Sequence, residues 1–403
     1  MIAENINQVK KFGGDKNMSE VKQLKLCLEK EVIVYYGMNI IDKLPDKINE
    51  YDYDKIFVLA DEDVFKIHGH SLKTAFNESN INFEVLYFNC TEKDKNFRNL
   101  EHICNTLIQK RISKSSIIVS FGGGMAGNIF GLAASLIYRG VRYIEMPTTF
   151  MGQTDGTLSN KQAINGGSGK NQIGTYYAPL FVWSDISYIK TEKIRYIRAA
   201  LVEGIKNTFI QDKETLAILE KLLYKEEYSE HELYNIFEII TDSKNKILKN
   251  DPTEKKYAVI LEYGHTVGHA IEFLTMGNII HGEAVAIGMC IEAEMSNLLS
   301  YLSDHDKEEH YRLLTPLLSK EVKELFSNLD NHSIYFEIQN DNKRVNSEVK
   351  YILLERMGRC VVTEDYQNSV TTQIIYQAID RFRKRIYQNN MNLMKKITVE
   401  EVV

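Results

Sequence analysis

The segment SIIVSFGGGMAGNIFGLAASLIYRG, residues 116–140, decides the fold class of this chain. Residues 116–121 form an apolar run typical of a buried strand, three glycines follow, and the remainder has the pattern of a helix. Gly122, Gly124 and Gly127 match G-x-G-x-x-G, a spacing that lets the backbone approach a pyrophosphate at the amino end of a helix. A tight strand-to-helix turn without any ligand would use the same glycines, so the motif alone leaves both interpretations open.

This glycine loop departs from the usual dinucleotide site in two ways. It follows several strand-like runs, whereas the usual motif occupies the first strand-to-helix turn. Glu145 meets only loosely the requirement for an acidic residue at the end of the next strand. The loop therefore predicts a nucleotide held in a variant of the usual site.

Apolar runs of strand length recur through the first half of the chain, at residues 31–37, 55–64, 83–89, 115–121 and 141–147. Strands that alternate with helical stretches predict βαβ units and a Rossmann-like, mostly parallel sheet. After about residue 190 the apolar spacing becomes helical, at residues 214–226, 232–250, 268–274 and 282–300. A small late β element is expected from residues 333–338 and 351–363.

These patterns predict an α/β domain followed by a mostly α-helical domain. We place a loose tail at residues 1–20, the nucleotide-binding α/β domain at 21–188 and the helical domain at 189–403. A length of 403 residues agrees with two domains, since domains commonly hold roughly 100–200 residues.

Composition limits the partners and the cellular location. A net charge of −6 without a basic block argues against nucleic acid as a partner. The five cysteines are scattered and odd in number, so a disulfide framework is not expected and a cytoplasmic location is predicted. The first residues lack the apolar core of a secretory signal, and no apolar run reaches the ~20 residues of a membrane span.

A glycine- and lysine-rich segment, residues 147–179, reads as a long functional loop. It carries Asp155, Lys161, Lys170 and Asn171 among many small polar residues. Lysines and backbone amides in such a loop suit an anionic group, most simply phosphate. A solvated surface loop, whose lysines serve only solubility, is the alternative interpretation and has equal weight.

The stretch EYGHTVGHAIE, residues 262–272, places His265 and His269 on one helix face, since side chains four residues apart are stacked neighbours. His281 stands at the start of another helix-like run, and Glu203 lies in LVEGIKN. Two histidines and a glutamate with an open position suit a catalytic zinc-type site. Because the residue after the first histidine is not the glutamate of H-E-x-x-H, a metalloprotease is disfavoured. The sequence leaves open which two histidines bind, and any one of them could be a hydrogen-bonded interior residue.

Six segments taken together resemble the dehydroquinate synthase superfamily of sugar phosphate cyclases. They are FGGGMAGNIFG, MPTTF, SGKNQIG, LVEGIKN, GHTVGHAIE and HGEAVAIGM, and the resemblance runs in the same order from about residue 25 to about residue 360. It implies an active site in the cleft between the two domains, a tightly bound NAD, one Zn²⁺ or Co²⁺ ion, a sugar phosphate substrate and a homodimer.

The resemblance also assigns roles to individual residues. It implies Glu203, His265 and His281 as metal ligands, and catalytic roles for Lys161, Lys206, Glu262 and His269. The implied cofactor contacts are Glu92, Lys95, Gly123, Gly124, Asn128, Thr148, Thr149, Asp155, Lys161 and Lys170. The implied substrate contacts are Asp155, Lys161, Asn171, Lys206, Lys244, Glu262, His269, Lys343 and Arg139, the last reaching the neighbouring subunit.

Two departures from the dehydroquinate branch bear on the substrate. Ala258 stands where that branch has an arginine that pairs with the substrate carboxylate, and Glu262 stands where it has an asparagine. A buried carboxylate without its arginine would cost several kcal/mol, on the order of the penalty for an unpaired buried charge. A neutral-headed sugar phosphate is therefore favoured, and Glu262 can accept hydrogen bonds from its hydroxyls.

The segments LEYGHTVGHAIE, EGIKN and SGKNQIGTYY are similar to 2-deoxy-scyllo-inosose synthases, lyases of aminoglycoside biosynthesis that cyclise glucose 6-phosphate. That reaction combines transient oxidation by NAD, phosphate elimination, re-reduction and intramolecular aldol closure. The alternatives are dehydroquinate synthase itself, a cyclase of sedoheptulose 7-phosphate, and a metal-dependent alcohol or glycerol dehydrogenase. A sugar-phosphate-binding regulatory protein is the non-catalytic alternative.

Overall fold

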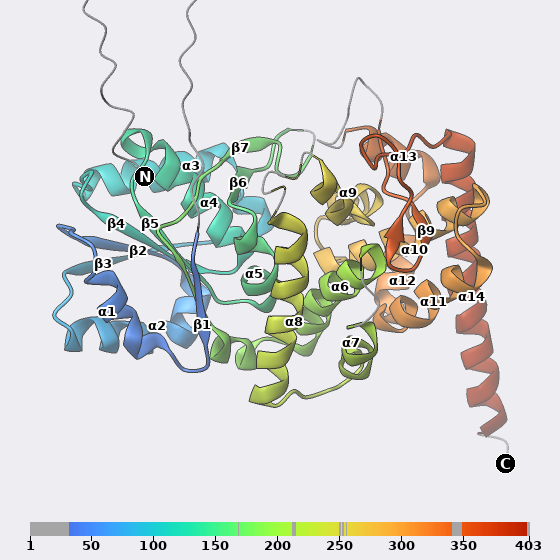
Figure 1. The fold of residues 1–403 in the computed structure, drawn as a ribbon, viewed down its shortest axis with the longest axis horizontal. Coiled ribbons are helices and arrows are strands. Elements are labelled where there is room, and N and C mark those ends of the chain that lie inside the picture. The colour runs from blue at the N-terminus through green and yellow to red at the C-terminus, as the bar shows by residue number, and fades with distance from the viewer. Residues whose placement is uncertain are drawn as a thin grey trace, which may run out of the picture. The chain divides into compact units, whose positions relative to one another are not determined.

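The computed structural model describes residues 32–167, 169–211, 215–249, 251, 254, 256–340 and 349–400, with the backbone alone for 388–400. Its main element is a six-stranded parallel sheet with the order β1-β8-β5-β4-β2-β3 (Figure 1). The strands are β1 (Val34–Gly37), β2 (Ile56–Asp61), β3 (Phe83–Phe88), β4 (Ile117–Gly122), β5 (Tyr143–Pro147) and β8 (Val182–Asp185). The predicted Rossmann-like sheet is confirmed.

Helices cover both faces of this sheet because its strands are apolar on both faces. The helices are α1 (Leu44–Ile48), α2 (Glu62–Glu78), α3 (Phe97–Gln109) and α4 (Gly124–Leu136). In β2, Phe57 and Leu59 belong to the core shared with α3 and α4. Val58 and Ala60 alternate with them and belong to the core on the opposite face, shared with α1 and α2. The alternation fixes which way each strand residue points.

The glycine loop lies where the strand order reverses. The chain runs from β2 outward to β3 and then returns to β4 on the other side of β2. A Cβ atom added to Gly122, at the end of β4, would lie 3.2 Å from Cβ of Asp61 at the end of β2. Ligands of open parallel sheets bind in the crevice at this position, outside the carboxyl ends of the strands.

The prediction that residues 147–179 form an irregular loop is wrong in part. The segment contains the short helix α5 (Phe150–Thr154) and an antiparallel hairpin of β6 (Lys161–Ile164) and β7 (Ile173–Tyr176). The hairpin is ordered because β6 packs on α4, with Gln162 and Ile164 buried. Lys161 therefore begins a strand, whereas Lys170 lies in the connection between the two strands.

Helices dominate the chain after β8 (Figure 1). They are α6 (Ile194–Ile210), α7 (Leu216–Leu223), α8 (Glu230–Leu248), α9 (His265–Leu274), α10 (His281–Leu298), α11 (Asp304–Leu314), α12 (Lys320–Ser327), α13 (Asn331–Gln339) and α14 (Thr372–Glu400), with the 3-10 helix η6 (Tyr257–Glu262) before α9. Helix α10 is the centre of this part, because it is buried on all sides from Gly282 to Ser296 and packs against α6, α9, α11 and α14. The mostly helical second part is confirmed, while the domain boundaries stay a prediction.

One local prediction in this part is wrong. Residues 333–338 form helix α13 and not a strand, because Asp330 caps the helix and Ile334 and Ile338 bury one helical face. A period of four residues, as between these two isoleucines, is helical. The other predicted segment does form a small β element, in which β9 (Leu354–Arg356) pairs with β10 (Arg359–Cys360).

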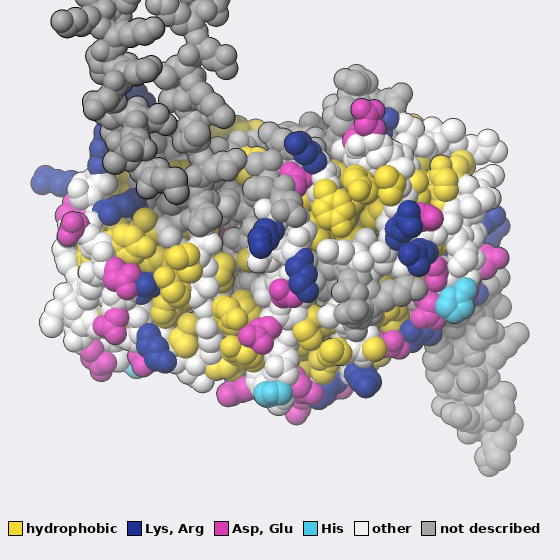
Figure 2. All heavy atoms as spheres, in the orientation of Figure 1, with side chains coloured by type: hydrophobic (Ala, Val, Ile, Leu, Met, Phe, Trp, Pro, Cys, Tyr) yellow, Lys and Arg dark blue, Asp and Glu magenta, His cyan; other side chains and the backbone are white. Residues whose placement is uncertain are grey.

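Acidic and basic side chains are interspersed on the described part of the face drawn in Figure 2. Among the described helices, none combines the length and the apolar character that a transmembrane helix requires.

Glu145 does not occupy the position of a ribose-binding carboxylate. It lies in the middle of β5, is 4% exposed, and is covered by α4, where a Cβ atom on Gly127 would lie 2.5 Å from Oε1 of Glu145. Burial raises the pKa of the Glu145 carboxyl to about 7, against the lowering effect of a hydrogen bond with Tyr143. The carboxyl is therefore protonated in the folded protein at pH values where it is ionised in the unfolded chain.

We expect Glu145→Gln to remove a pH-dependent part of the stability. A raised folded pKa contributes stability that is complete below the unfolded value near 4.5 and is lost as the pH rises through 7. The variant should therefore gain about 2.5 kcal/mol relative to the wild type between pH 5 and pH 8. Urea unfolding at both pH values measures this gain, with the exposed Glu78→Gln as control. An equal stability difference at both pH values would contradict the assignment.

Candidate active site

Backbone contacts between three helices assemble the site. Gly264 immediately precedes α9 and has a φ of 76°, which glycine adopts without strain. A Cβ atom on Gly268 would lie 3.0 Å from the carbonyl oxygen of Ala284 in α10, and one on Gly282 would lie 2.3 Å from that of Ala199 in α6. The glycines therefore let α9 and α6 approach the backbone of α10, which explains the glycines beside the histidines.

This packing brings together Glu203 from α6, His265 from α9 and His281 from α10. One ligand atom of each lies within 4.8 Å of the others. Oε1 of Glu203 is 3.6 Å from Nε2 of His265 and 3.5 Å from Nε2 of His281. Two ligand atoms of a tetrahedral ion, each bound at about 2.1 Å, lie roughly 3.4 Å apart. The spacing of the carboxylate and imidazole atoms therefore fits a zinc-type ion.

The carboxylate of Glu203 has one oxygen available for such an ion. Its Oε2 accepts a hydrogen bond of 2.6 Å from Nζ of Lys206. Its Oε1 is buried and has no closer polar partner among the described residues. A buried polar atom without a good hydrogen bond is costly, and a bound cation would compensate it. His269 lies beside the trio, with its ring centre 5.3 Å from that of His265.

Charges of opposite sign hold each other ionised in this buried cluster. Burial opposes the charged form of Glu203, but Lys206 and the two histidines hold its pKa well below the ordinary value. Burial likewise lowers the pKa of Lys206, yet Glu203 and Asp155 together raise it. The pKa of His281 rises to about 10, because Glu203 and a second carboxylate outweigh burial. The site therefore favours positive charge at its centre.

Three lysines converge on the same region. Nζ of Lys244 lies 2.5 Å from Oδ1 of Asp155, and Nζ of Lys161 lies 2.6 Å from Oε2 of Glu254. Burial lowers the pKa of Lys161, but the charges of Glu262 and Glu254 together outweigh burial and raise the pKa. The same Glu262 charge acts on Lys206, so this glutamate lies within electrostatic range of two of the lysines. Such a group of cations suits a phosphorylated ligand.

A second cluster lies at the glycine loop. Nζ of Lys95 donates to Oδ1 of Asn128 at 2.7 Å and to Oδ1 of Asn171. Burial lowers the pKa of Lys95 to about 8. Gly123 precedes α4, and no side chain of the described residues caps this helix. A Cβ atom on Gly124 would meet nothing within 4 Å. The helix end therefore offers amide groups and open space to a phosphate.

The other positions implied by the resemblance have different surroundings. Thr149 caps α5 through a hydrogen bond from the amide of Gly152, and the amide of Thr148 donates to the carbonyl of Gly122. Arg139 is exposed in the 3-10 turn that follows α4, with a φ of 67°. Its role toward a neighbouring subunit stays a prediction. Lys343 lies outside the described residues.

One carboxylate at the site was missed by the sequence analysis. Oε2 of Glu272 lies 3.1 Å from Nδ1 of His281, and Oε1 lies 2.5 Å from Nζ of Lys170. Lys170 also lies 3.2 Å from Oε2 of Glu92, so both of these predicted cofactor contacts are engaged with protein groups. The signal was the spacing, since Glu272 follows His265 by seven residues and shares its helix face.

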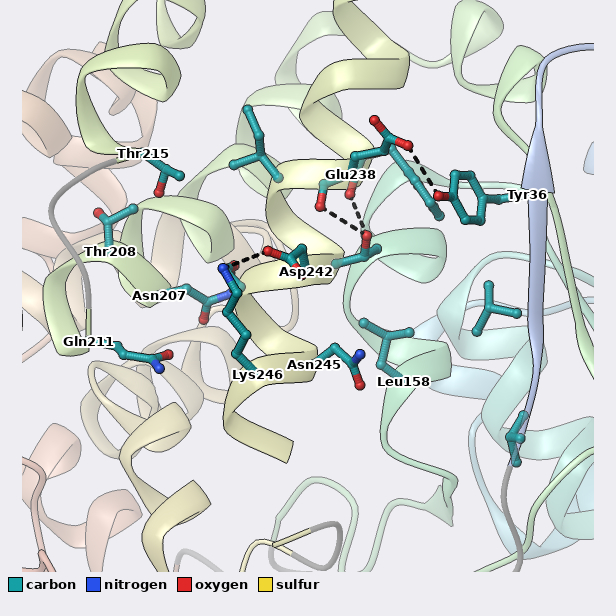
Figure 3. Close-up of a pocket in the computed structure, with 16 residues that line it drawn as sticks. Tyr36, Leu158, Asn207, Thr208, Gln211, Thr215, Glu238, Asp242, Asn245 and Lys246 are labelled. Carbon is teal, nitrogen blue, oxygen red and sulfur yellow. Dashed lines mark hydrogen bonds and ion pairs between the residues drawn. The ribbon is translucent and has the colours of Figure 1, made fainter. Parts of the chain in front are cut away.

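A large cavity lies apart from these residues (Figure 3). It has a volume of about 670 Å³ and is lined by parts of β1, α6 and α8, including Tyr36, Asn207, Asp242 and Lys246. Tyr36 and Glu238 form a hydrogen bond across its rim. None of the three residues of the Glu203 trio is in its described lining. The described lining of this cavity is therefore separate from the Glu203 trio.

Comparison with known proteins agrees with the geometry of the site. Residues 85–199 match the family described as 3-dehydroquinate synthase N-terminal, and residues 200–344 match 3-dehydroquinate synthase C-terminal. The chain is 33% identical to the 2-deoxy-scyllo-inosose synthase of Niallia circulans over 310 residues, which are 77% of this chain and 83% of that protein. It is 31% identical to the 3-dehydroquinate synthase of Thermodesulfovibrio yellowstonii, over 76% of this chain and 85% of that one.

Solved structures give the same result. The crystal structure of a 2-deoxy-scyllo-inosose synthase complexed with carbaglucose-6-phosphate, NAD⁺ and Co²⁺ superposes with a TM-score of 0.78 at 29% identity, covering 87% of this chain and 95% of that one. The order of the motifs, the two family matches and the shared fold lead to one assignment. The chain belongs to the dehydroquinate synthase superfamily of sugar phosphate cyclases.

Proposed function

We propose that this protein converts glucose 6-phosphate to 2-deoxy-scyllo-inosose with release of phosphate. The observation that carries the proposal is the placement of a glutamate, Glu262, at the end of η6, three residues before His265 and within electrostatic range of Lys161 and Lys206. Ala258, four residues earlier, is fully buried and offers no cation. A substrate carboxylate would meet the repulsion of Glu262 without a compensating arginine, whereas sugar hydroxyls would donate hydrogen bonds to it.

The side chains and backbone amides of the site suit the NAD⁺ and Co²⁺ bound in the crystal structure of the 2-deoxy-scyllo-inosose synthase. Glu203, His265 and His281 would hold one Zn²⁺ or Co²⁺ ion, and the amino end of α4 at Gly123 and Gly124 would hold the pyrophosphate of NAD. When bound, the nucleotide accepts and returns a hydride and the metal polarises a substrate oxygen.

The protein's own residues supply the remaining chemistry. In the proposed reaction, oxidation at C4 acidifies the C5 proton, which leaves as phosphate departs from C6. Lys161, Lys206 and Lys244 would offset the charge of the departing phosphate. Glu262 would orient the hydroxyls, and His269, beside the metal ligands, would move a proton. After C4 is reduced again, the hemiacetal ring opens, and aldol addition closes the carbocycle if the open-chain intermediate stays bound at this site.

Phosphate release tests the proposal. The full chain is incubated with NAD⁺ and Co²⁺ and with glucose 6-phosphate, a carboxylated heptulosonate phosphate or sedoheptulose 7-phosphate. We expect phosphate from glucose 6-phosphate without net NADH. Release from the heptulosonate alone would place the chain with the dehydroquinate synthases, which are its second candidate function at 31% identity. Net NADH without phosphate would indicate a dehydrogenase.

We expect Glu262→Gln to lower turnover of glucose 6-phosphate about a hundredfold, the lower range for removing one preorganised hydrogen-bonding group from an active site. Co²⁺ affinity should stay within about twofold of the wild type, since the Glu203 trio is intact. Glu238→Gln is the matched control, because this glutamate lines the separate cavity and contacts Tyr36. Full activity of Glu262→Gln would remove Glu262 from the substrate site.

A further inference from the structure

We infer that Glu272 and Lys170 are a positioning pair that fixes the metal-ligating ring of His281. The inference rests on the proposed metal site. Oε2 of Glu272 is 3.1 Å from Nδ1 of His281, while Oε1 of the same carboxylate is 2.5 Å from Nζ of Lys170. The side chains of Glu272 and Lys170 are only 8% and 12% exposed. The two oxygens of one buried carboxylate therefore serve two different partners.

The contact with Glu272 decides which nitrogen of His281 faces the metal site. A carboxylate only accepts hydrogen bonds, so Nδ1 of His281 carries a hydrogen and donates it to Oε2. When a metal is bound, Nε2 would be the nitrogen that loses its hydrogen, because Glu272 retains the one on Nδ1, and Nε2 is the atom 3.5 Å from Oε1 of Glu203. A carboxylate behind a ligating histidine fixes the tautomer and the ring orientation, and it raises the basicity of the ligand.

Lys170 in turn holds Glu272. A buried carboxylate keeps its charge only if it is paired, and Nζ of Lys170 supplies that pairing on the side away from His281. Lys170 is anchored from the other side by Oε2 of Glu92 at 3.2 Å, and Oε1 of Glu92 accepts from Asn165 at 2.6 Å. The hairpin connection that carries Lys170 thus acts on the metal site through Glu272.

The arrangement gives α9 two functions. The helix contributes His265 as a ligand and, seven residues later, holds His281 of α10 through Glu272. The two ligating imidazoles therefore depend on one helix for their orientation.

Co²⁺ titration of the metal-free full chain, followed by the visible d–d absorption, tests the pair. We expect Glu272→Ala to raise the Kd for Co²⁺ by about 10–100-fold, as for other outer-shell carboxylates, and to shift the d–d bands. Glu272→Gln keeps the volume of the side chain and should raise the Kd about tenfold. Lys170→Met should also raise it, and the double variant with Glu272→Ala should match Glu272→Ala alone, because Lys170 acts through Glu272.

The matched control is Glu283→Gln. Glu283 is a buried carboxylate two residues after His281, but it pairs with Arg195 instead of the histidine. Its replacement should leave the Kd within about twofold of the wild type. His281→Ala distinguishes a failure of the positioning role of Glu272 from a failure of the proposed metal site. If Glu272→Ala and Glu272→Gln both bind Co²⁺ like the wild type while His281→Ala does not, the positioning role is overturned. If His281→Ala also binds normally, the proposed metal site itself is overturned.

Discussion

Replacing His265 by alanine is expected to abolish both metal binding and phosphate release. The variant removes one of the three donors that lie within 4.8 Å of one another. It leaves a single imidazole and the Glu203 carboxylate, too few ligands for a stable four-coordinate site. A metal that polarises an oxygen is worth several kcal/mol, so turnover should fall at least about a thousandfold. Elemental analysis and a phosphate assay on the same preparation measure the two losses.

The control for this experiment is His310→Gln. His310 is also fully buried in the helical part, but it is hydrogen-bonded to Tyr263 and to the carbonyl of Asp306 and lies outside the trio. The control should keep its metal, even though loss of a buried hydrogen bond lowers stability. Metal content near one ion per chain in His265→Ala would remove this residue from the ligand set.

Replacing Lys206 by methionine is expected to destabilise the metal-free protein by about 3–5 kcal/mol, the cost of leaving a buried charge without its partner. Lys206 is 2% exposed and lies 2.6 Å from Oε2 of Glu203, and Glu203 is fully buried. Co²⁺ should restore part of this loss in the variant, because the ion would compensate the charge of Glu203. Urea unfolding with and without Co²⁺ measures both effects.

Lys190→Met is the comparison for Lys206→Met. Lys190 and Glu230 form an exposed pair at 2.6 Å, and such pairs contribute little to stability. The same loss of stability with and without Co²⁺ in Lys206→Met would mean that the ion does not reach Glu203. A loss no larger than that of Lys190→Met would mean that the buried pair does not form.

The sequence was sufficient to predict those features of the fold and of the site that a local pattern determines. The glycine loop follows a fully apolar strand, so both the parallel sheet and the turn at Gly122 could be predicted. The spacing of His265 and His269 predicted one helix face, and the position of His281 predicted a helix start. These features depend on neighbours within a few residues.

The rest depends on contacts between distant segments. Residue spacing alone could not select His281 over His269 as a neighbour of Glu203, and only the family resemblance did, because that choice follows from the crossing of α6 and α10. Lys170 and Glu272 are 102 residues apart, so their pairing has no local signal. The hairpin of β6 and β7 was missed because its many glycines and polar residues hide the few buried positions that pack on α4.

The close packing of α9 and α6 on α10 makes metal-ion affinity depend on different residues from those that set most of the stability of the helical part. The distance between the ligands is set by backbone touching backbone at Gly268 and Gly282, not by the volume of the surrounding apolar side chains. Mutational drift in the wider helical core can therefore erode stability while ion affinity stays constant. An alanine at either glycine would lower both stability and ion affinity, because its Cβ atom would push the helices and their ligands apart without deleting a single donor.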